Sequence, residues 1–205
     1  MHGYDEAVLV AELATMPAGH QLAFAAAVAT RQLESYEWYA RRFCPGAIAR
    51  PREIAMMLWS EPSNERHDWA ECLAEVLGLM PEESNEWTVF HSLAEDALAS
   101  LAYAVRALLT ADPQEAAWAA RRGYEAVDQA AIRLMGIHPG TQEAEQAILE
   151  HPLVQQELGR QRRDLLLIAT DPGVDALAAL RDQALAEPSL GIADLELLAC
   201  REPPC

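Results

Sequence analysis

Residues 112–136, DPQEAAWAARRGYEAVDQAAIRLMG, decide the fold class of this protein. Asp112 can accept a hydrogen bond at the N-cap, and Pro113 follows at N1, where a missing N–H costs nothing. Glu115 stands where an acid can reach back to the cap, and Gly136 is a residue that commonly ends helices. Apolar or small side chains recur between these signals at Ala117, Ala120, Tyr124, Val127, Ala131 and Leu134. The pattern predicts a helix over 113–135 with this stripe buried.

The same spacing of three and four residues continues through the chain on both sides of this segment. No stretch of strict alternation bounded by turn residues interrupts it, so strands are not expected. We expect helices at about 5–16, 18–43, 51–59, 65–80, 85–108, 141–149, 152–168 and 172–187, with a short packed segment within 189–198. The caps expected for three of these are residues 61–64, Ser84 or Asn85, and Asp171.

These expectations give an all-α fold, a compact bundle of roughly eight to ten helices. Alanine supplies much of the apolar content and aromatic residues make up only 6%, which favours closely packed helices over sheet. The length of 205 residues is compatible with one domain over 1–205, with a frayed tail at 199–205.

The charge balance excludes several kinds of function. There are 32 acidic and 15 basic residues, a formal net charge of -17, which disfavours nucleic acid and anionic membrane surfaces as partners. Every basic residue is arginine, so chemistry that needs a lysine, such as Schiff-base catalysis or P-loop phosphate binding, is excluded. The expected partner is therefore a protein or a second copy of this chain.

The cysteines and the N-terminus indicate the compartment. Cys44, Cys72, Cys200 and Cys205 form no CxxC pair, so neither a zinc module nor a small disulfide framework is expected. The N-terminal segment has no basic region ahead of its apolar residues, and no apolar run is long enough to span a membrane. We expect a cytoplasmic protein without a cofactor.

Four polar residues on expected helices are candidates for ligand binding. His91 and Glu95 stand four apart with Asp96 adjacent, a spacing that lets an imidazole and a carboxylate reach one metal, although helices offer such pairs freely. Gln161 lies on an otherwise apolar stripe, so its amide must find polar partners, either an internal network or a ligand. A pocket lined by Asp96, Glu157, Gln161 and His91 is the site that a ligand would use; no metal is expected beyond the weak His91 and Glu95 pair.

The aromatic group Tyr36, Trp38, Tyr39 and Phe43 is the candidate interface. Positions 36, 38 and 39 point in different directions on a helix, so one buried face cannot hide them all and part of the group should be exposed. Core packing explains such residues most simply. The alternative is a partner-binding edge, because aromatic residues next to arginine, here Arg41 and Arg42, are enriched at interface centres.

Several short patterns resemble one family of bacterial proteins. The N-terminal part carries Phe24, Arg31, Tyr36 and Tyr39, and then Leu58 and Trp59; the next block carries Val89, Phe90, Asp96, Ala97 and Leu101. The most specific block is Glu150, Pro152, Val154, Gln156, Glu157 and Gln161, and Leu180, Arg181 and residues 189–192 follow. Together these patterns resemble the YjaG-like family, catalogued as a domain of unknown function. Departures are Glu34 in place of proline, Thr30 in place of an acid, and Gly159 in place of a larger residue.

The resemblance implies a compact helical cytoplasmic protein and supplies no catalytic residues. The leading hypothesis is a non-enzymatic protein-interaction module, of which an immunity or antitoxin-like protein that blocks a basic toxin is one concrete form. The alternative is an enzyme or binder of a small ligand or metal, with a polar pocket between helices. A homodimer whose acidic surface only secures solubility is the third.

Overall fold

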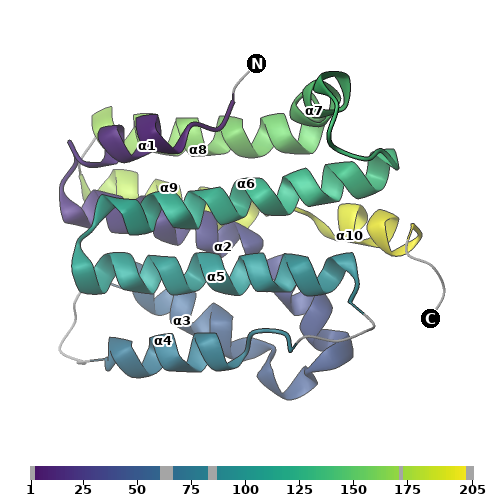
Figure 1. The fold of residues 1–205 in the computed structure, drawn as a ribbon. Helices are drawn as coiled ribbons and strands as arrows, with labels where there is room; N and C mark the ends of the chain where they lie inside the picture. The colour runs from purple at the N-terminus through teal and green to yellow at the C-terminus, as the bar shows by residue number, and fades with distance from the viewer. Residues whose placement is uncertain (1–2, 61–66, 83–86, 171–172, 202–205) are drawn as a thin grey trace.

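The computed structural model describes residues 3–60, 67–82, 87–170 and 173–201. Within these ranges there are ten α-helices, one 3-10 helix and no strand, which confirms the all-α bundle (Figure 1). The elements are α1 (Glu6–Leu13), α2 (Ala18–Phe43), η1 (Pro45–Ala47), α3 (Ala49–Trp59), α4 (Trp69–Gly78), α5 (Val89–Thr110), α6 (Pro113–Met135), α7 (Gln142–Leu149), α8 (Pro152–Thr170), α9 (Val174–Ala186) and α10 (Ile192–Ala199).

Helix α6 begins and ends where the sequence predicts. The Asp112 side chain accepts a hydrogen bond from the backbone N–H of Gln114, and Pro113 occupies the first turn. Gly136 ends the helix with φ of 64°, a left-handed conformation that glycine adopts without strain. Local capping chemistry therefore sets where this helix begins and where it ends.

Two other helix starts differ from the prediction. Helix α4 begins at Trp69, later than expected, because the Asp68 side chain accepts hydrogen bonds from the N–H groups of the first turn. Helix α5 begins at Val89, where Thr88 and His91 form a capping box. The other expected caps, at residues 61–64, Ser84, Asn85 and Asp171, lie outside the described residues.

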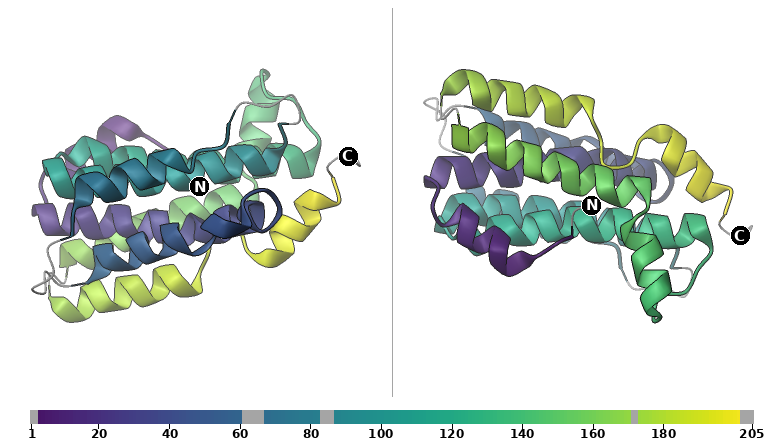
Figure 2. Two further views of the ribbon diagram at one scale, coloured as in Figure 1. Left: turned by 90° about the horizontal axis from the view of Figure 1, so that it is seen from below. Right: turned by 90° about the horizontal axis from the view of Figure 1, so that it is seen from above.

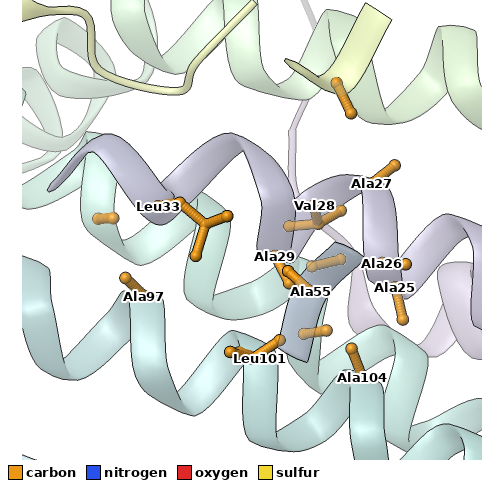
Figure 3. Close-up of a cluster of buried hydrophobic side chains, with 14 of the residues drawn as sticks. Ala25, Ala26, Ala27, Val28, Ala29, Leu33, Ala55, Ala97, Leu101 and Ala104 are labelled. Atoms are coloured by element: carbon orange, nitrogen blue, oxygen red, sulfur yellow. The ribbon is translucent and has the colours of Figure 1, made fainter. Parts of the chain in front are cut away.

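Helix α2 runs through the middle of the bundle and contacts α3, α5, α6, α8 and α9. Its segment 23–29 consists of five alanines with Phe24 and Val28, and all seven side chains are buried. Figure 3 shows Ala25 and Ala29 of this segment on the side of α2 that faces Leu101 and Ala104 of α5. Small side chains let neighbouring helices approach closely, so backbone atoms supply much of the dispersion contact in this core.

The C-terminal helices close the bundle around α2. After α8 and α9, which pack on α2 and on one another, the backbone N–H of Ser189 donates to the carbonyl oxygen of Arg31 at 2.9 Å. Helices α7 and α10 lie at the same end of the bundle (Figure 2). Of the tail predicted at 199–205, Ala199 ends α10, residues 200–201 form a turn, and 202–205 lie outside the described residues.

No helix in the described ranges has both the length and the apolar content needed to cross a bilayer.

Candidate functional site

A fully buried ion cluster lies where α2 and α8 meet; Arg31, Glu157, Gln161, Asp164 and Ser189 form this Arg31 cluster. The side chains of Arg31, Glu157 and Asp164 have no exposed area. The NH1 atom of Arg31 is 2.6 Å from Oδ2 of Asp164, and its NH2 atom is 3.7 Å from Oε1 of Glu157. One buried guanidinium thus faces two carboxylates that lie about two turns apart on α8.

The polar neighbours of Glu157 complete the cluster. Nε2 of Gln161 donates to Oε1 of Glu157 and to the backbone carbonyl of Ala120, each at 3.1 Å. The Ser189 hydroxyl donates to Oε2 of Glu157 at 2.9 Å. Both Glu157 oxygens therefore have partners inside the protein.

Gly123 of α6 lies against the Arg31 cluster, and its missing side chain leaves space for the buried groups. A Cβ at this position would lie 2.8 Å from Cγ1 of Val28 and 3.2 Å from Oε1 of Glu157. The first distance is shorter than real Cβ contacts, so only glycine lets α6 approach α2 and α8 this closely.

Burial and charge act in opposite directions on the groups in the Arg31 cluster. Burial alone lowers the pKa of Arg31, but the carboxylates of Glu157 and Asp164 outweigh it and the net pKa is raised. Burial also raises the pKa of Asp164, although the Arg31 charge opposes this effect. Arg160 adds a second positive charge 3.8 Å from Glu157. The cluster is a closed ion network that couples α2 to α8.

Asp96 occupies a separate polar site between α5 and α6. Its Oδ1 lies 3.2 Å from NH1 of Arg122, and its Oδ2 accepts a hydrogen bond of 3.1 Å from Gln129. Burial raises the pKa of Asp96 to about 7, against the lowering effect of Arg122. Among the described residues, no hydrogen bond or ion pair joins Asp96 to Glu157 or Gln161.

His91 lies in aromatic surroundings near the start of α5. Its Nδ1 accepts a hydrogen bond from the Thr88 backbone N–H at 3.1 Å, and its ring lies within about 5 Å of the Tyr39, Phe43 and Trp87 rings. Burial lowers the pKa of His91, so the ring is neutral at pH 7. Glu95 is exposed. In the ranges that the structure describes, no three His, Cys, Asp or Glu side chains are grouped to hold a metal ion.

The four predicted ligand-binding residues therefore do not line one pocket. Glu157 and Gln161 meet in the closed Arg31 cluster, whereas Asp96 and His91 lie in two other places. Gln161 reaches only the wall of a surface groove of about 180 Å³ between α1 and α8.

A second depression lies at the C-terminal end of α2. We call it the aromatic groove; its lining residues are Trp38, Tyr39, Arg41, Arg42 and Phe43 of α2, Phe90 of α5 and Ala199 of α10. It has a volume of about 350 Å³. Its rings contact one another, with centroids 4.8 Å apart for Tyr39 and Phe43 and 6.3 Å apart for Trp38 and Phe90.

The predicted aromatic interface divides between core and surface. Tyr36 is fully buried, and its hydroxyl donates to the Ala47 carbonyl at 3.2 Å, so the structure places this residue in the core. Tyr39 is mostly buried, Trp38 is half-buried, and Phe43 is 42% exposed. Part of the group is exposed, as the different directions of these residues predict.

Arg41 at the edge of the groove is held only loosely. Its side chain is 50% exposed, and its nitrogen atoms lie 3.8 Å from Glu34 and 3.6 Å from Glu37. These separations exceed the length of a hydrogen bond. Glu37 instead accepts a hydrogen bond of 2.5 Å from Arg52.

Sequence reasoning missed Asp164 in the buried cluster and Ala199 in the groove. Arg31, Ser189 and Phe90 entered only through the family resemblance. For Arg31 the available signal was its position directly after the small and apolar run 23–30, where a charged side chain must find a buried counter-ion.

The fold and these sites define the class of protein as an all-α helical bundle. Residues 9–193 match the family described as "Protein of unknown function (DUF416)", and the chain belongs to this family. It is similar to the crystal structure of a DUF416 family protein from Shewanella baltica OS155, with a TM-score of 0.79 and 16% identity over 94% of this chain and 99% of that chain. At this identity the likeness shows the shared fold. No curated protein matches the chain.

Proposed function

We propose that this protein is a non-enzymatic interaction module of the cytoplasm, and that the aromatic groove is its docking site for a protein partner. The observation that carries the proposal is the 42% exposure of Phe43 within a stacked ring cluster flanked by two arginines. Aromatic and arginine side chains are enriched among the residues that dominate binding energy at interfaces.

The buried polar residues favour this reading over an enzyme or a binder of small ligands. Such a site needs polar groups that converge on a cavity open to the ligand. Here the Glu157 carboxylate has protein partners at both oxygens and no exposed area. We therefore assign a structural role to the Arg31 cluster and propose that a partner binds at the surface.

The proposal includes two more specific statements. The first is that, within the DUF416 family, this chain belongs to the YjaG-like group, which its sequence patterns resemble. The immunity-like form, in which the acidic protein binds a basic toxin, draws support from the net charge of -17, but the two arginines at the groove favour an acidic contact there.

The test is affinity capture from the native cell with the wild-type chain and a Phe43→Ser variant. We expect the wild type to retain a stoichiometric protein partner and Phe43→Ser to lose it, while circular dichroism shows the same helix content for both. Recovery of no stoichiometric protein by the wild type, together with a monomeric chain in sedimentation, would contradict an interaction role.

A further inference from the structure

We infer that the aromatic groove binds a short acidic segment of a protein partner, with an aromatic or large aliphatic side chain in the groove and a neighbouring carboxylate on Arg41. The inference rests on the proposed function and adds the chemistry of the partner.

The volume and lining of the groove select the apolar part of this ligand. A depression of about 350 Å³ lies near the lower end of the roughly 300–1,000 Å³ range of ligand pockets, which suits a side chain better than a folded surface. Its lining includes the rings of Trp38, Tyr39 and Phe90 together with the exposed ring of Phe43. An inserted ring can make offset or edge contacts with several of these faces at once.

Arg41 supplies the recognition of a carboxylate. No described residue accepts a hydrogen bond from its guanidinium, and its nearest acids remain 3.6 and 3.8 Å away. Other arginines of this protein are paired tightly: Arg50 lies 2.6 Å from Glu75, and Arg163 lies 2.7 Å from Glu187. Arg41 can therefore turn its planar donor pair to an incoming carboxylate without breaking a short ion pair.

Arg42 and His91 set the local charge around this contact. The Arg42 guanidinium lies over the Phe43 ring at 5.3 Å from its centroid, a cation–π arrangement that places a second positive charge beside the exposed ring. Burial, and then the charge of Arg42, lowers the pKa of His91. The imidazole therefore adds a neutral face below Phe43 and no further charge.

The charge of the whole molecule limits the acidic part of the ligand to a short segment. A net charge of -17 repels an extended acidic surface, and Glu34 and Glu37 stand beside Arg41. Screening at physiological salt reduces the repulsion from acids farther away than about 8 Å, so the nearby charges, which are the two arginines with Glu34 and Glu37, decide what binds at contact distance. A single carboxylate next to an aromatic side chain can contact the arginines and still avoid strong repulsion by the acidic protein, provided that the rest of the partner is neutral or basic.

The experiment uses fluorescence anisotropy with the full chain and a short fluorescein-labelled peptide in which phenylalanine alternates with aspartate. Matched peptides carry asparagine for aspartate or alanine for phenylalanine. We expect Arg41→Gln to weaken binding of the acidic peptide about tenfold, since the substitution removes a charge-assisted hydrogen bond to the peptide carboxylate. Phe43→Ser should weaken it comparably, and either peptide substitution should do the same.

Arg181→Gln is the matched control, because Arg181 is similarly exposed, at 42%, and among the residues that the structure describes it pairs with the adjacent Asp182 alone. It should leave peptide binding unchanged. Equal affinity of the aspartate and asparagine peptides, equal effects of Arg41→Gln and Arg181→Gln, or no binding of the acidic peptide at millimolar concentration would each overturn the inference. Self-association of the chain that Phe43→Ser abolishes would overturn it in favour of a homodimer.

Failure of the inference and failure of the proposed function give different results. If wild type, Arg41→Gln and Phe43→Ser capture a partner equally well, the protein has an interaction role but the aromatic groove is not its docking site. A wild-type chain that captures no partner removes the role itself.

Discussion

Helix α2 carries two arginines in opposite environments, Arg31 in its middle and Arg41 near its end. Arg31 has no exposed side-chain area and lies 2.6 Å from Asp164, whereas Arg41 is 50% exposed and no closer than 3.6 Å to any acid with which it pairs. The Arg31 guanidinium has a structural role, because its removal would leave the carboxylates of Glu157 and Asp164 buried without a counter-ion. The Arg41 guanidinium costs little to displace, which is what a group that binds a partner requires.

The sharpest test of this contrast replaces each arginine with methionine. Arg31→Met leaves the carboxylates of Glu157 and Asp164 buried without their cation, so the free energy of unfolding should fall by about 3–5 kcal/mol. Arg41→Met should change it by no more than about 0.5 kcal/mol, as expected for an exposed charge. Urea unfolding at pH 7, followed by circular dichroism, measures both. Equal losses for the two variants would mean that burial does not separate their roles.

Asp96 sharpens the comparison, because it is as buried as the Arg31 cluster but its cation Arg122 is 34% exposed. Burial raises the pKa of Asp96 to about 7 from an ordinary value of 3.8. Between these values the folded protein holds a proton that the unfolded chain has released, so this group stabilises the fold at low pH and loses that effect as the pH rises through the window.

Asp96→Asn should therefore remove a pH dependence of about 3 kcal/mol, since each unit of pKa shift corresponds to about 1.4 kcal/mol. The measured quantity is the difference in unfolding free energy between variant and wild type at pH 5 and at pH 8, with the variant gaining at pH 8. A constant difference across this range would show that Arg122 and Gln129 keep the carboxylate ionised at both pH values.

Gly123→Ala tests how tightly the Arg31 cluster is closed. The added methyl group would lie 2.8 Å from Val28 and 3.2 Å from Glu157, both of them buried. Overpacking of this kind costs about 1–3 kcal/mol and should exceed the roughly 1 kcal/mol that alanine gains over glycine in a helix. A net loss of about 1 kcal/mol in thermal or urea unfolding is expected. A gain in stability would show that α6 can move away from α2.

Gly159→Ala is the matched substitution and the smallest expected effect. Gly159 lies within α8, and a Cβ at this position would meet nothing within 4 Å. Only the helix-propensity term remains, so the variant should gain about 0.5–1 kcal/mol in the same unfolding experiment. A loss would indicate that this face of α8 is packed in a way that the structure does not show.

Local signals made most of the fold predictable from the sequence. The cap at Asp112, Pro113 at N1 and Gly136 at the end each act within one helical turn, and all three are confirmed for α6. The start of α4 was harder to predict from the sequence. Several nearby side chains could serve as its N-cap, and the folded backbone determines that Asp68 is the one used.

The sites were harder to predict, because they join residues that are distant in the chain. The pairing of Arg31 with Asp164 depends on how α2 crosses α8, and no spacing within either helix encodes it. The exposure of part of the aromatic group followed from helix geometry alone. That Tyr36 lies inside and Phe43 outside depends on neighbouring elements such as η1, whose Ala47 accepts the Tyr36 hydroxyl.

The hydrogen bond from Ser189 to Arg31 also bears on how the protein is made. A ribosome completes α2 well before it reaches Asp164 and Ser189, because both residues lie far downstream in the chain. Until they are made, the Arg31 guanidinium lacks these native partners and stays hydrated, which opposes early burial of the alanine segment beside it. The nascent chain is thus expected to lock its central helix only once α8 and residue 189 have left the exit tunnel.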